Sequence, residues 1–446
     1  MDRLLAVLAC PVGVETQHVA EAVQGRFSLG TYDFRLQSGV GLIPAIRSVR
    51  ILGDSAASER TVIRGLYRIW KRPATAVPGR QWGLPIVVAS LLLACSQRGG
   101  SQGAGPIVVP TPTALPCIAS GSCTLREAAE AAQLRVGVAA APGEEGWDSL
   151  VVKEFDALSP EGELLWNVIH PSPDEWDFEA ADQTLAFAEE HGLLTTVSHF
   201  VWDQATSISS TPDWVKAIQD PDELRRVMRD HLAAITARYG GKINRWIVVN
   251  EPLEYGGTAL YRNHFYDVLG PDYISQAFRI VKEAAPDSEL WLNEIFTENN
   301  PAKASALVDL AANLVATGVP IDGVGLQGHL FAGDPDYELV QDTMQRLANL
   351  GLKVAITELD APVGDDLPGR LEVQAQRMAG MVRACLAVPA CDSVTFWGLD
   401  DEVSWLNWFL APNLDPLLFD ALLRPKPAYF AVRDALLAGR PDVATP

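Results

Sequence analysis

Positive charge is scarce over most of this 446-residue sequence. The whole chain holds 35 Lys and Arg against 56 Asp and Glu, and residues 81–446 alone hold 24 against 50. A surface this acidic argues against nucleic acid or an anionic membrane as a partner of the main domain. It fits a domain that handles a neutral or cationic ligand, and an apolar fraction of 48% is enough for one large core.

Cysteine and histidine are also few, with six and seven residues. Cys117 and Cys123 lie six positions apart, as do Cys385 and Cys391, and such short loops can close disulfides in an exported chain. Neither pair has zinc-finger spacing and no histidine cluster accompanies them, so we expect no metal and no cofactor. A Gly-rich phosphate loop is missing after the first strand, which excludes the usual dinucleotide-binding fold.

Residues 84–94 form an apolar run of 11, which is too short to span a bilayer. The run ends in Leu92-Leu93-Ala94-Cys95-Ser96, which resembles the lipobox of bacterial lipoproteins, where the cysteine is lipidated after cleavage. We therefore expect residues 64–95 to be an export signal and Cys95 to anchor an extracellular or cell-surface lipoprotein. The alternative is a buried element of a small N-terminal domain. Basic residues precede the run, as in export signals: Arg64, Arg68, Lys71, Arg72 and Arg80.

A signal that begins near residue 64 is displaced, because export signals lie at the N-terminus. No Met occurs between Met1 and Met228. We hypothesise that residues 1–63 are an upstream extension and that translation starts at a non-Met codon nearer the signal. Residues 96–116, rich in Gly, Ser, Pro and Thr, are expected to be a linker that holds the body, residues 117–440, away from the membrane.

Apolar β-runs alternate with amphipathic helical stretches throughout the body. Strands are expected at 135–140, 155–160, 193–201, 245–251, 290–295, 321–327, 353–359 and 393–399. Helices are expected at 124–133, 179–191, 222–239, 271–285, 301–317, 336–350 and 370–387. Eight βα repeats predict an α/β fold, a closed (β/α)8 TIM barrel rather than an open doubly wound sheet.

Two glutamates lie at the ends of these apolar strands. Glu251 closes Arg-Trp-Ile-Val-Val-Asn-Glu, and Glu358 comes near the end of Lys-Val-Ala-Ile-Thr-Glu-Leu-Asp. A carboxylate is costly inside a buried strand, but the C-terminal ends of barrel strands are where active sites assemble. The repeat count places the two residues on strands four and seven. They indicate a nucleophile and an acid/base acting on a glycosidic bond.

Five segments around these glutamates follow one another in a characteristic order. They are 246–251, 322–329, 356–360, 396–405 and 416–429. Together they resemble glycoside hydrolase family 10, the endo-1,4-beta-xylanase family, over residues 124–438. The resemblance implies a retaining enzyme, and the Cys385 and Cys391 pair falls where many members of the family have a disulfide.

The resemblance also implies a role for each matching side chain. Glu251 would be the acid/base and Glu358 the nucleophile, with His329 orienting Glu358 and Asp360 supporting the histidine. Asn250 would bond the sugar 2-OH. The remaining substrate-binding candidates are Gln327, Glu161, His199, Trp202, Trp397 and Trp405. Taken alone, the amides could simply cap strand ends, and the tryptophans could be core residues.

The sequence departs from the family pattern in the segments after strands two, three and five. Gly162 and Leu165 replace an Asn and a Lys that bond substrate hydroxyls in the family. Without a gap, Ser198 and Asp203 replace two histidines, and a one-residue slip would let His199 take the first position. The segment 293–296 lacks a second Asn.

We therefore expect a monomeric retaining endo-β-1,4-glycanase that acts on xylan, a differently substituted xylan or a related β-glycan. One alternative is another barrel glycosidase with glutamates on strands four and seven, such as a β-glucanase or mannanase, and Pro252 is more typical of those enzymes. A second alternative is a surface glycan-binding protein without hydrolytic activity.

Overall fold

The structure is a computed structural model that describes residues 28–29, 32–33, 117, 121–143, 145–204, 210–364 and 369–441. The chain divides into two units, Met1–Thr111 and Pro112–Pro446. The described residues of the first unit form two antiparallel strands, β1 (Ser28–Leu29) and β2 (Tyr32–Asp33). The predicted signal segment, Cys95 and the predicted linker lie outside the described residues. Within the described part, no helix is long and apolar enough to cross a membrane.

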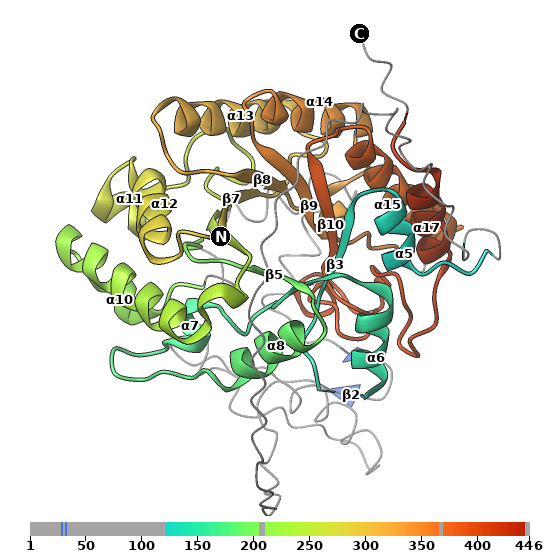
Figure 1. Ribbon diagram of the computed structural model, residues 1–446, viewed down its shortest axis with the longest axis horizontal. Helices are drawn as coiled ribbons and strands as arrows, with labels where there is room; N and C mark the ends of the chain where they lie inside the picture. Colours follow the sequence, from blue (N-terminus) through green and yellow to red (C-terminus); the bar gives the residue numbers. More distant parts are fainter. Residues whose placement is uncertain are drawn as a thin grey trace, which may run out of the picture. The chain divides into compact units, whose positions relative to one another are not determined.

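Eight parallel strands of the second unit close into a barrel in the order β10-β3-β4-β5-β6-β7-β8-β9 (Figure 1). The strands are β3 (Arg135–Ala139), β4 (Ala157–Ser159), β5 (Leu194–Val197), β6 (Arg245–Asn250), β7 (Glu289–Glu294), β8 (Gly323–Leu326), β9 (Lys353–Leu359) and β10 (Cys391–Phe396). The last strand pairs with the first, so the predicted (β/α)8 barrel is confirmed, and β6 and β9 are its fourth and seventh strands.

Helices surround the barrel and connect its strands (Figure 1). They are α5 (Leu125–Ala131), α6 (Glu145–Glu154), α7 (Trp166–Ile169), α8 (Glu179–Glu190), α9 (Asp213–Lys216), α10 (Pro221–Tyr239), η1 (Gly240–Lys242), α11 (His264–Leu269), α12 (Tyr273–Ala284), α13 (Pro301–Ala316), η2 (Leu330–Ala332), α14 (Tyr337–Ala348), α15 (Arg370–Leu386), α16 (Leu406–Phe409) and α17 (Pro427–Ala438). All seven predicted helices are present. Helix α6 was not predicted, because Val151 is its only fully buried apolar side chain among residues 146–154 and its apolar stripe is weak.

The barrel interior is filled by side chains, and glycines on β8 make room for the largest of them. A Cβ at Gly323 would lie 2.4 Å from the ring of Trp291, which is fully buried on β7. A Cβ at Gly325 would lie 2.3 Å from Asn293 Oδ1 and 2.5 Å from Thr357 Cγ2. Because these distances are below van der Waals contact, β8 must carry glycine where its neighbours project inward.

Two disulfides each close a short loop of the second unit. Cys385, in the last turn of α15, is joined to Cys391 at the start of β10, and Cys117 is joined to Cys123 just before α5. Both bonds join the cysteines that the sequence pairs by spacing.

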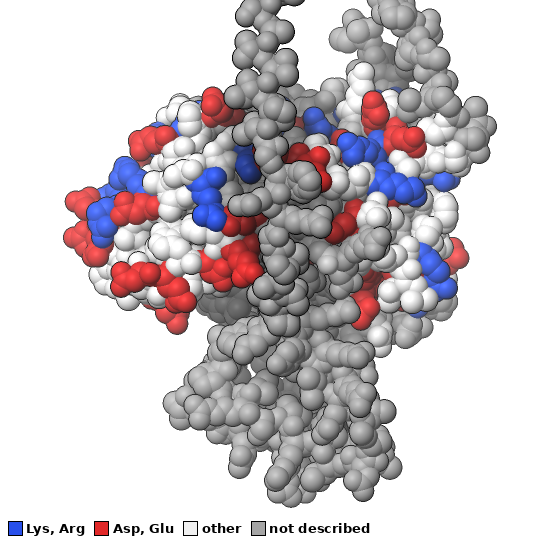
Figure 2. Space-filling model, turned by 60° about the horizontal axis from the view of Figure 1, so that its bottom comes forward, with Lys and Arg blue, Asp and Glu red and all other residues white. Residues whose placement is uncertain are grey.

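The described surface mixes charges of both signs. In Figure 2, Asp and Glu side chains are spread over the described face, with Lys and Arg among them. Several lie in ion pairs, such as Lys242 with Glu189 and Arg226 with Asp230.

Candidate active site

Two carboxylates project from the C-terminal end of the barrel. Glu251 directly follows β6, and Glu358 is the penultimate residue of β9. Their side chains are almost completely buried, with 5% and 4% of their surfaces exposed. Both face side chains from neighbouring strands, as the sequence predicts for carboxylates at strand ends.

Glu358 is held by three side chains from three other strands or the loops that follow them. Asn293 Nδ2 donates to its Oε1 at 2.6 Å, His329 Nε2 lies 3.2 Å from Oε2, and His199 Nε2 lies 3.4 Å from Oε1. Burial alone would raise the pKa of Glu358, but its contacts with His199 and His329 outweigh burial and lower the pKa to about 2. The carboxylate is therefore ionised over the whole physiological range.

His329 lies between two carboxylates. Its Nδ1 is 2.8 Å from Asp360 Oδ2, on the side away from Glu358. Burial alone would lower the pKa of His329, yet Asp360 and Glu358 raise it to about 10, so the ring is an imidazolium at neutral pH. Trp405 Nε1 donates to the same Asp360 oxygen at 2.9 Å. Asp360 thus fixes both the histidine and the tryptophan.

Glu251 contacts uncharged hydrogen-bond donors instead of histidines. Its Oε1 accepts from Gln327 Nε2 at 3.0 Å and from Asn250 Nδ2 at 3.3 Å, and its Oε2 accepts from Tyr255 Oη at 2.9 Å. The residue has a left-handed backbone, with φ of 52°, a strained conformation that costs about 1–3 kcal/mol. Backbone bonds hold it there: the amide of Glu251 donates to Asn293 O, and Gln204 Nε2 donates to Glu251 O.

A chain of buried amides connects the two glutamates. Asn293 Nδ2 bonds both Glu358 and Asn250 Oδ1, and Thr357 Oγ1 donates to Asn293 Oδ1 at 2.6 Å. Gln327 Nε2 bonds Asn250 Oδ1 at 3.2 Å as well as Glu251. The sequence singled out Asn250 and Gln327 but assigned no function to Asn293 or Tyr255. The signal for Asn293 is its position at the end of an apolar strand, the same signal that identified the glutamates.

A buried ion pair lies behind Glu251. Glu294 and Lys303 are both fully buried, with Nζ 3.1 Å from Oε1, and Glu294 also accepts from the backbone amides of Leu253 and Ile295. Burial raises the pKa of Glu294 to about 7 despite the lysine, and the nearby charge of Glu251 adds to the shift. This pair fastens the loop that follows Glu251 to β7.

Aromatic rings and a third carboxyl complete the described site. His199 lies between Trp202 and Trp397, at centroid distances of 4.9 and 6.3 Å, and Trp405 packs against His329 at 4.9 Å. Burial, with the charges of Glu163 and Glu358, raises the pKa of Glu161 to about 8. Every substrate-binding residue proposed from the sequence therefore lies at this end of the barrel.

Comparison with known proteins identifies the family of this barrel. The sequence pattern of glycosyl hydrolase family 10 matches residues 124–435. The chain belongs to this family.

Relatives in family 10 cover most of the body. Endo-1,4-beta-xylanase B of Thermotoga neapolitana is 32% identical over 364 residues, covering 79% of this chain and 97% of the relative. Beta-1,4-xylanase of Dictyoglomus thermophilum is 34% identical, covering 64% of this chain and 83% of the relative. The crystal structure of xylanase 10B from Thermotoga maritima superposes with a TM-score of 0.65 at 32% identity, covering 70% of this chain and 98% of that one. Xylanase 10B from Thermotoga petrophila, solved in complex with xylobiose, gives the same TM-score, with coverage of 70% and 97%.

The departures from the family 10 pattern have distinct structural outcomes. His199, not Ser198, reaches Glu358, so the histidine position next to the nucleophile is filled despite the ungapped mismatch. Asp203 accepts from the backbone amide of His264 and pairs with Lys216, and it thereby holds α11 and α9 to the barrel. Gly162 has open space where a Cβ would stand, and Leu165 precedes α7 without a capping side chain. The lysine of the family pattern thus has no counterpart at 165.

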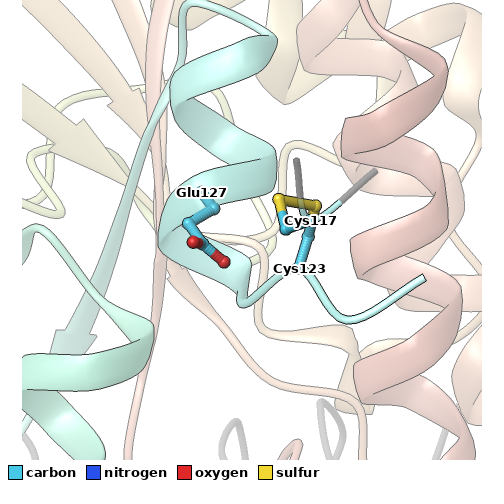
Figure 3. Close-up of side chains that lie close together, drawn as sticks. All are labelled: Cys117, Cys123 and Glu127. Atoms are coloured by element: carbon cyan, nitrogen blue, oxygen red, sulfur yellow. A yellow bond between two sulfur atoms is a disulfide. The ribbon is translucent and has the colours of Figure 1, made fainter. Parts of the chain in front are cut away.

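One group of potential metal ligands lies outside this site, among the described residues. It consists of Cys117, Cys123 and Glu127, and Figure 3 shows the disulfide beside the first turn of α5. Both sulfurs are in the disulfide, and the Glu127 carboxylate accepts from the amide and hydroxyl of Thr124 in a capping box. Helix capping therefore accounts for Glu127 without a metal ion.

Proposed function

We propose that the protein is an endo-1,4-beta-xylanase that hydrolyses xylan with retention of configuration, with Glu358 as nucleophile and Glu251 as acid/base. The observation that carries this proposal is the contrast between the two carboxyls. Glu358 is ionised by two histidines and an amide, whereas Glu251 contacts only neutral donors. A retaining glycosidase needs this division between an ionised nucleophile and a proton donor.

The reaction proceeds by two displacements. A Glu358 oxygen attacks the anomeric carbon while Glu251 gives its proton to the glycosidic oxygen, so the bond to the leaving sugar breaks and a glycosyl-enzyme ester forms. Water then attacks the same carbon as Glu251 takes its proton. The ester bond breaks, Glu358 returns as a carboxylate, and the sugar is released with its original configuration.

His329 and Asp360 prepare the nucleophile rather than transfer the proton. The imidazolium fixes one Glu358 oxygen, and Asp360 keeps the ring charged and oriented. Asn250 and Gln327, which bond Glu251 in the free protein, bond sugar hydroxyls when substrate is present. Trp202, Trp397 and Trp405 offer ring faces for sugar stacking around the same point.

Hydrolysis of xylo-, cello- and manno-oligosaccharides tests this proposal against the β-glucanase and mannanase alternatives. We expect the xylo-oligosaccharides to be cleaved fastest, with β-configured first products by NMR. Glu251→Gln should lower kcat/KM about 10²–10⁴-fold, the usual contribution of a general acid/base, and Glu358→Ala should abolish turnover. Glu254→Gln is the matched control, because Glu254 is exposed in the same loop. Inverted products, or full activity of Glu358→Ala, would contradict the proposal, and binding without hydrolysis would favour a glycan-binding protein.

The altered recognition residues should change the KM for unsubstituted xylan. Gly162 and Leu165 replace an Asn and a Lys of the family pattern, and a hydrogen bond contributes about 0.5–1.5 kcal/mol when both groups are neutral and about 1.5–3 kcal/mol when one is charged. We therefore expect a higher KM for unsubstituted xylo-oligosaccharides than in family members that retain both groups. Equal KM values, measured side by side with such a member, would contradict this expectation.

We also propose that the protein is exported as a monomer anchored through a lipidated Cys95. The proposal rests on the lipobox-like sequence at 92–96, the basic residues before it and the linker that follows. Mass spectrometry of the mature N-terminus should find a diacylated Cys95, and Cys95→Ala should prevent acylation while Cys10→Ala does not. Sedimentation velocity of the detergent-solubilised protein tests the monomer. A mature chain that retains residues 1–63 would contradict the export proposal.

A further inference from the structure

The segment 403–410, which includes α16, exposes apolar side chains to solvent. Eight large apolar side chains are exposed among the described residues, and four of them lie in this one segment. Trp408 is the extreme case, with 63% of its surface exposed, and the other three are Val403, Phe409 and Leu410. Exposed apolar residues scattered singly are ordinary, but a contiguous group marks a binding surface.

This group is connected to the catalytic residues through ring contacts. The ring of Trp408 lies 6.3 Å from the ring of Trp405 and 6.1 Å from that of Phe409, and Phe409 lies 4.9 Å from Trp405. Trp405 in turn bonds Asp360 and packs against His329, which holds Glu358. Positions 405, 408 and 409 stand at helical spacing, so their rings share one side of α16. Trp408 is therefore two ring contacts away from the histidine that orients the nucleophile.

The charges of the segment that carries this surface disfavour anionic ligands. Residues 397–426 are all described, and their two cations are each paired: Lys426 with Asp401 and Arg424 with Asp420. Glu402 is exposed immediately before the apolar group. A uronate substituent or an anionic lipid would therefore find no unpaired cation within residues 397–426, whereas an uncharged sugar ring can stack on the exposed aromatic faces.

From these observations we propose that Trp408 and Phe409 form an additional subsite that stacks an uncharged sugar ring of the xylan chain, beyond the sugars bound next to Glu251 and Glu358. The inference rests on the proposed xylanase function. It makes Trp408 a specificity-determining residue that favours long, uncharged chains over short or uronate-substituted ones.

Chain-length kinetics test the subsite. kcat/KM of the full-length protein is measured for linear xylo-oligosaccharides of three to six sugars, and for a six-sugar chain bearing a glucuronate. For Trp408→Ala we expect about a tenfold loss on the longest neutral chain, the upper end of what an aromatic contact contributes, and less than a twofold change on the shortest. Trp408→Tyr should retain most of the advantage because it keeps a ring face. Phe430→Ala is the control, because Phe430 is 43% exposed on α17.

The outcomes separate the subsite from the proposed function. If the wild-type protein cleaves no xylo-oligosaccharide of any length, the xylanase function fails. If it cleaves all lengths but Trp408→Ala loses the same factor on each, or nothing on any, the subsite is refuted. Preference of the wild type for the glucuronate-bearing chain would also overturn it. Vesicle binding or self-association that Trp408→Ala abolishes, with unchanged length dependence, would assign the surface to lipid or to a second copy and would equally overturn the proposal.

Discussion

Replacing Gly325 by alanine should damage catalysis, although no atom of the glycine contacts the substrate site. A Cβ at 325 would stand 2.3 Å from Asn293 Oδ1 and 2.5 Å from Thr357 Cγ2, so Asn293 must move. That amide donates to both Glu358 and Asn250. Loss of a hydrogen bond to a charged group costs about 1.5–3 kcal/mol, which corresponds to about a 10- to 150-fold loss of kcat/KM if the full contribution is made in the transition state.

The same substitution overpacks the barrel interior, and we expect it to destabilise the fold by about 1–3 kcal/mol. Activity must therefore be measured well below the unfolding temperature, with urea denaturation run in parallel. Gly241→Ala is the matched control, because a Cβ there meets nothing within 4 Å.

A double-mutant cycle tests whether Gly325→Ala lowers activity by displacing Asn293. Asn293→Ala removes the clash with Asn293 Oδ1 and the bond to Glu358, and it leaves only the contact with Thr357 Cγ2, so Gly325→Ala should cost less activity in that background than in the wild type. Activity of Gly325→Ala within twofold of wild type would refute the reasoning. So would additive losses in the double variant, because they would mean that Gly325 acts on something other than Asn293.

Three further predictions concern buried titratable side chains. Because the pKa of Glu161 is raised to about 8, the carboxyl loses its proton as pH rises through 8, and we expect KM for xylo-oligosaccharides to rise there; Glu161→Gln should remove that step from the KM–pH profile. Lys303→Met leaves Glu294 buried without its partner and should lower the free energy of unfolding by about 3–5 kcal/mol in urea titrations. Lys242→Met removes one partner of an exposed pair and should change the free energy of unfolding by less than about 1 kcal/mol. Burial holds the pKa of His231 well below its ordinary value of 6.5, so the unfolded chain takes up a proton that the folded chain does not. The free energy of unfolding should therefore fall as pH drops below about 6.5. His231→Phe should make the loss of stability between pH 7 and 5 shallower.

The barrel and its two glutamates could be predicted because each depends on a local pattern. Buried parallel strands read as apolar runs, and a carboxylate at the end of such a run is conspicuous against them. The side-chain hydrogen bonds between different strands and loops could not be predicted in this way. Asn293 and Tyr255 contact the glutamates only after β6, β7 and β9 have been brought together, and nothing in their immediate sequence specifies those partners. Their functions become visible only when strand register is known.

Strand ends were the weakest part of the prediction for the same reason. The apolar run 193–201 reads as one strand, but β5 ends at Val197 and pairing resumes only at Val201, which bridges to Val249. Between them lie Ser198 and His199, and His199 Nε2 lies 3.4 Å from Glu358 Oε1. The hydrophobic periodicity of the sequence does not reveal such a break in a strand, because Val197 and Phe200 on its two sides are both apolar and buried.

That break explains how the protein keeps a histidine at the nucleophile while losing both histidines of the ungapped family pattern. The backbone amides of Phe200 and Val201 donate to Ile247 and Val248, which anchors the segment along β6 and directs His199 to Glu358. Farther along, Asp203 is committed to the backbone of α11 and to Lys216, so the second position is structural and no longer available to the sugar. The contact of a histidine, His199, with the nucleophile is therefore retained, whereas Asp203 at the second position bonds other parts of the protein instead of the substrate. For this reason we expect the chain to differ from other family members in KM and substrate preference rather than in the ability to break the bond.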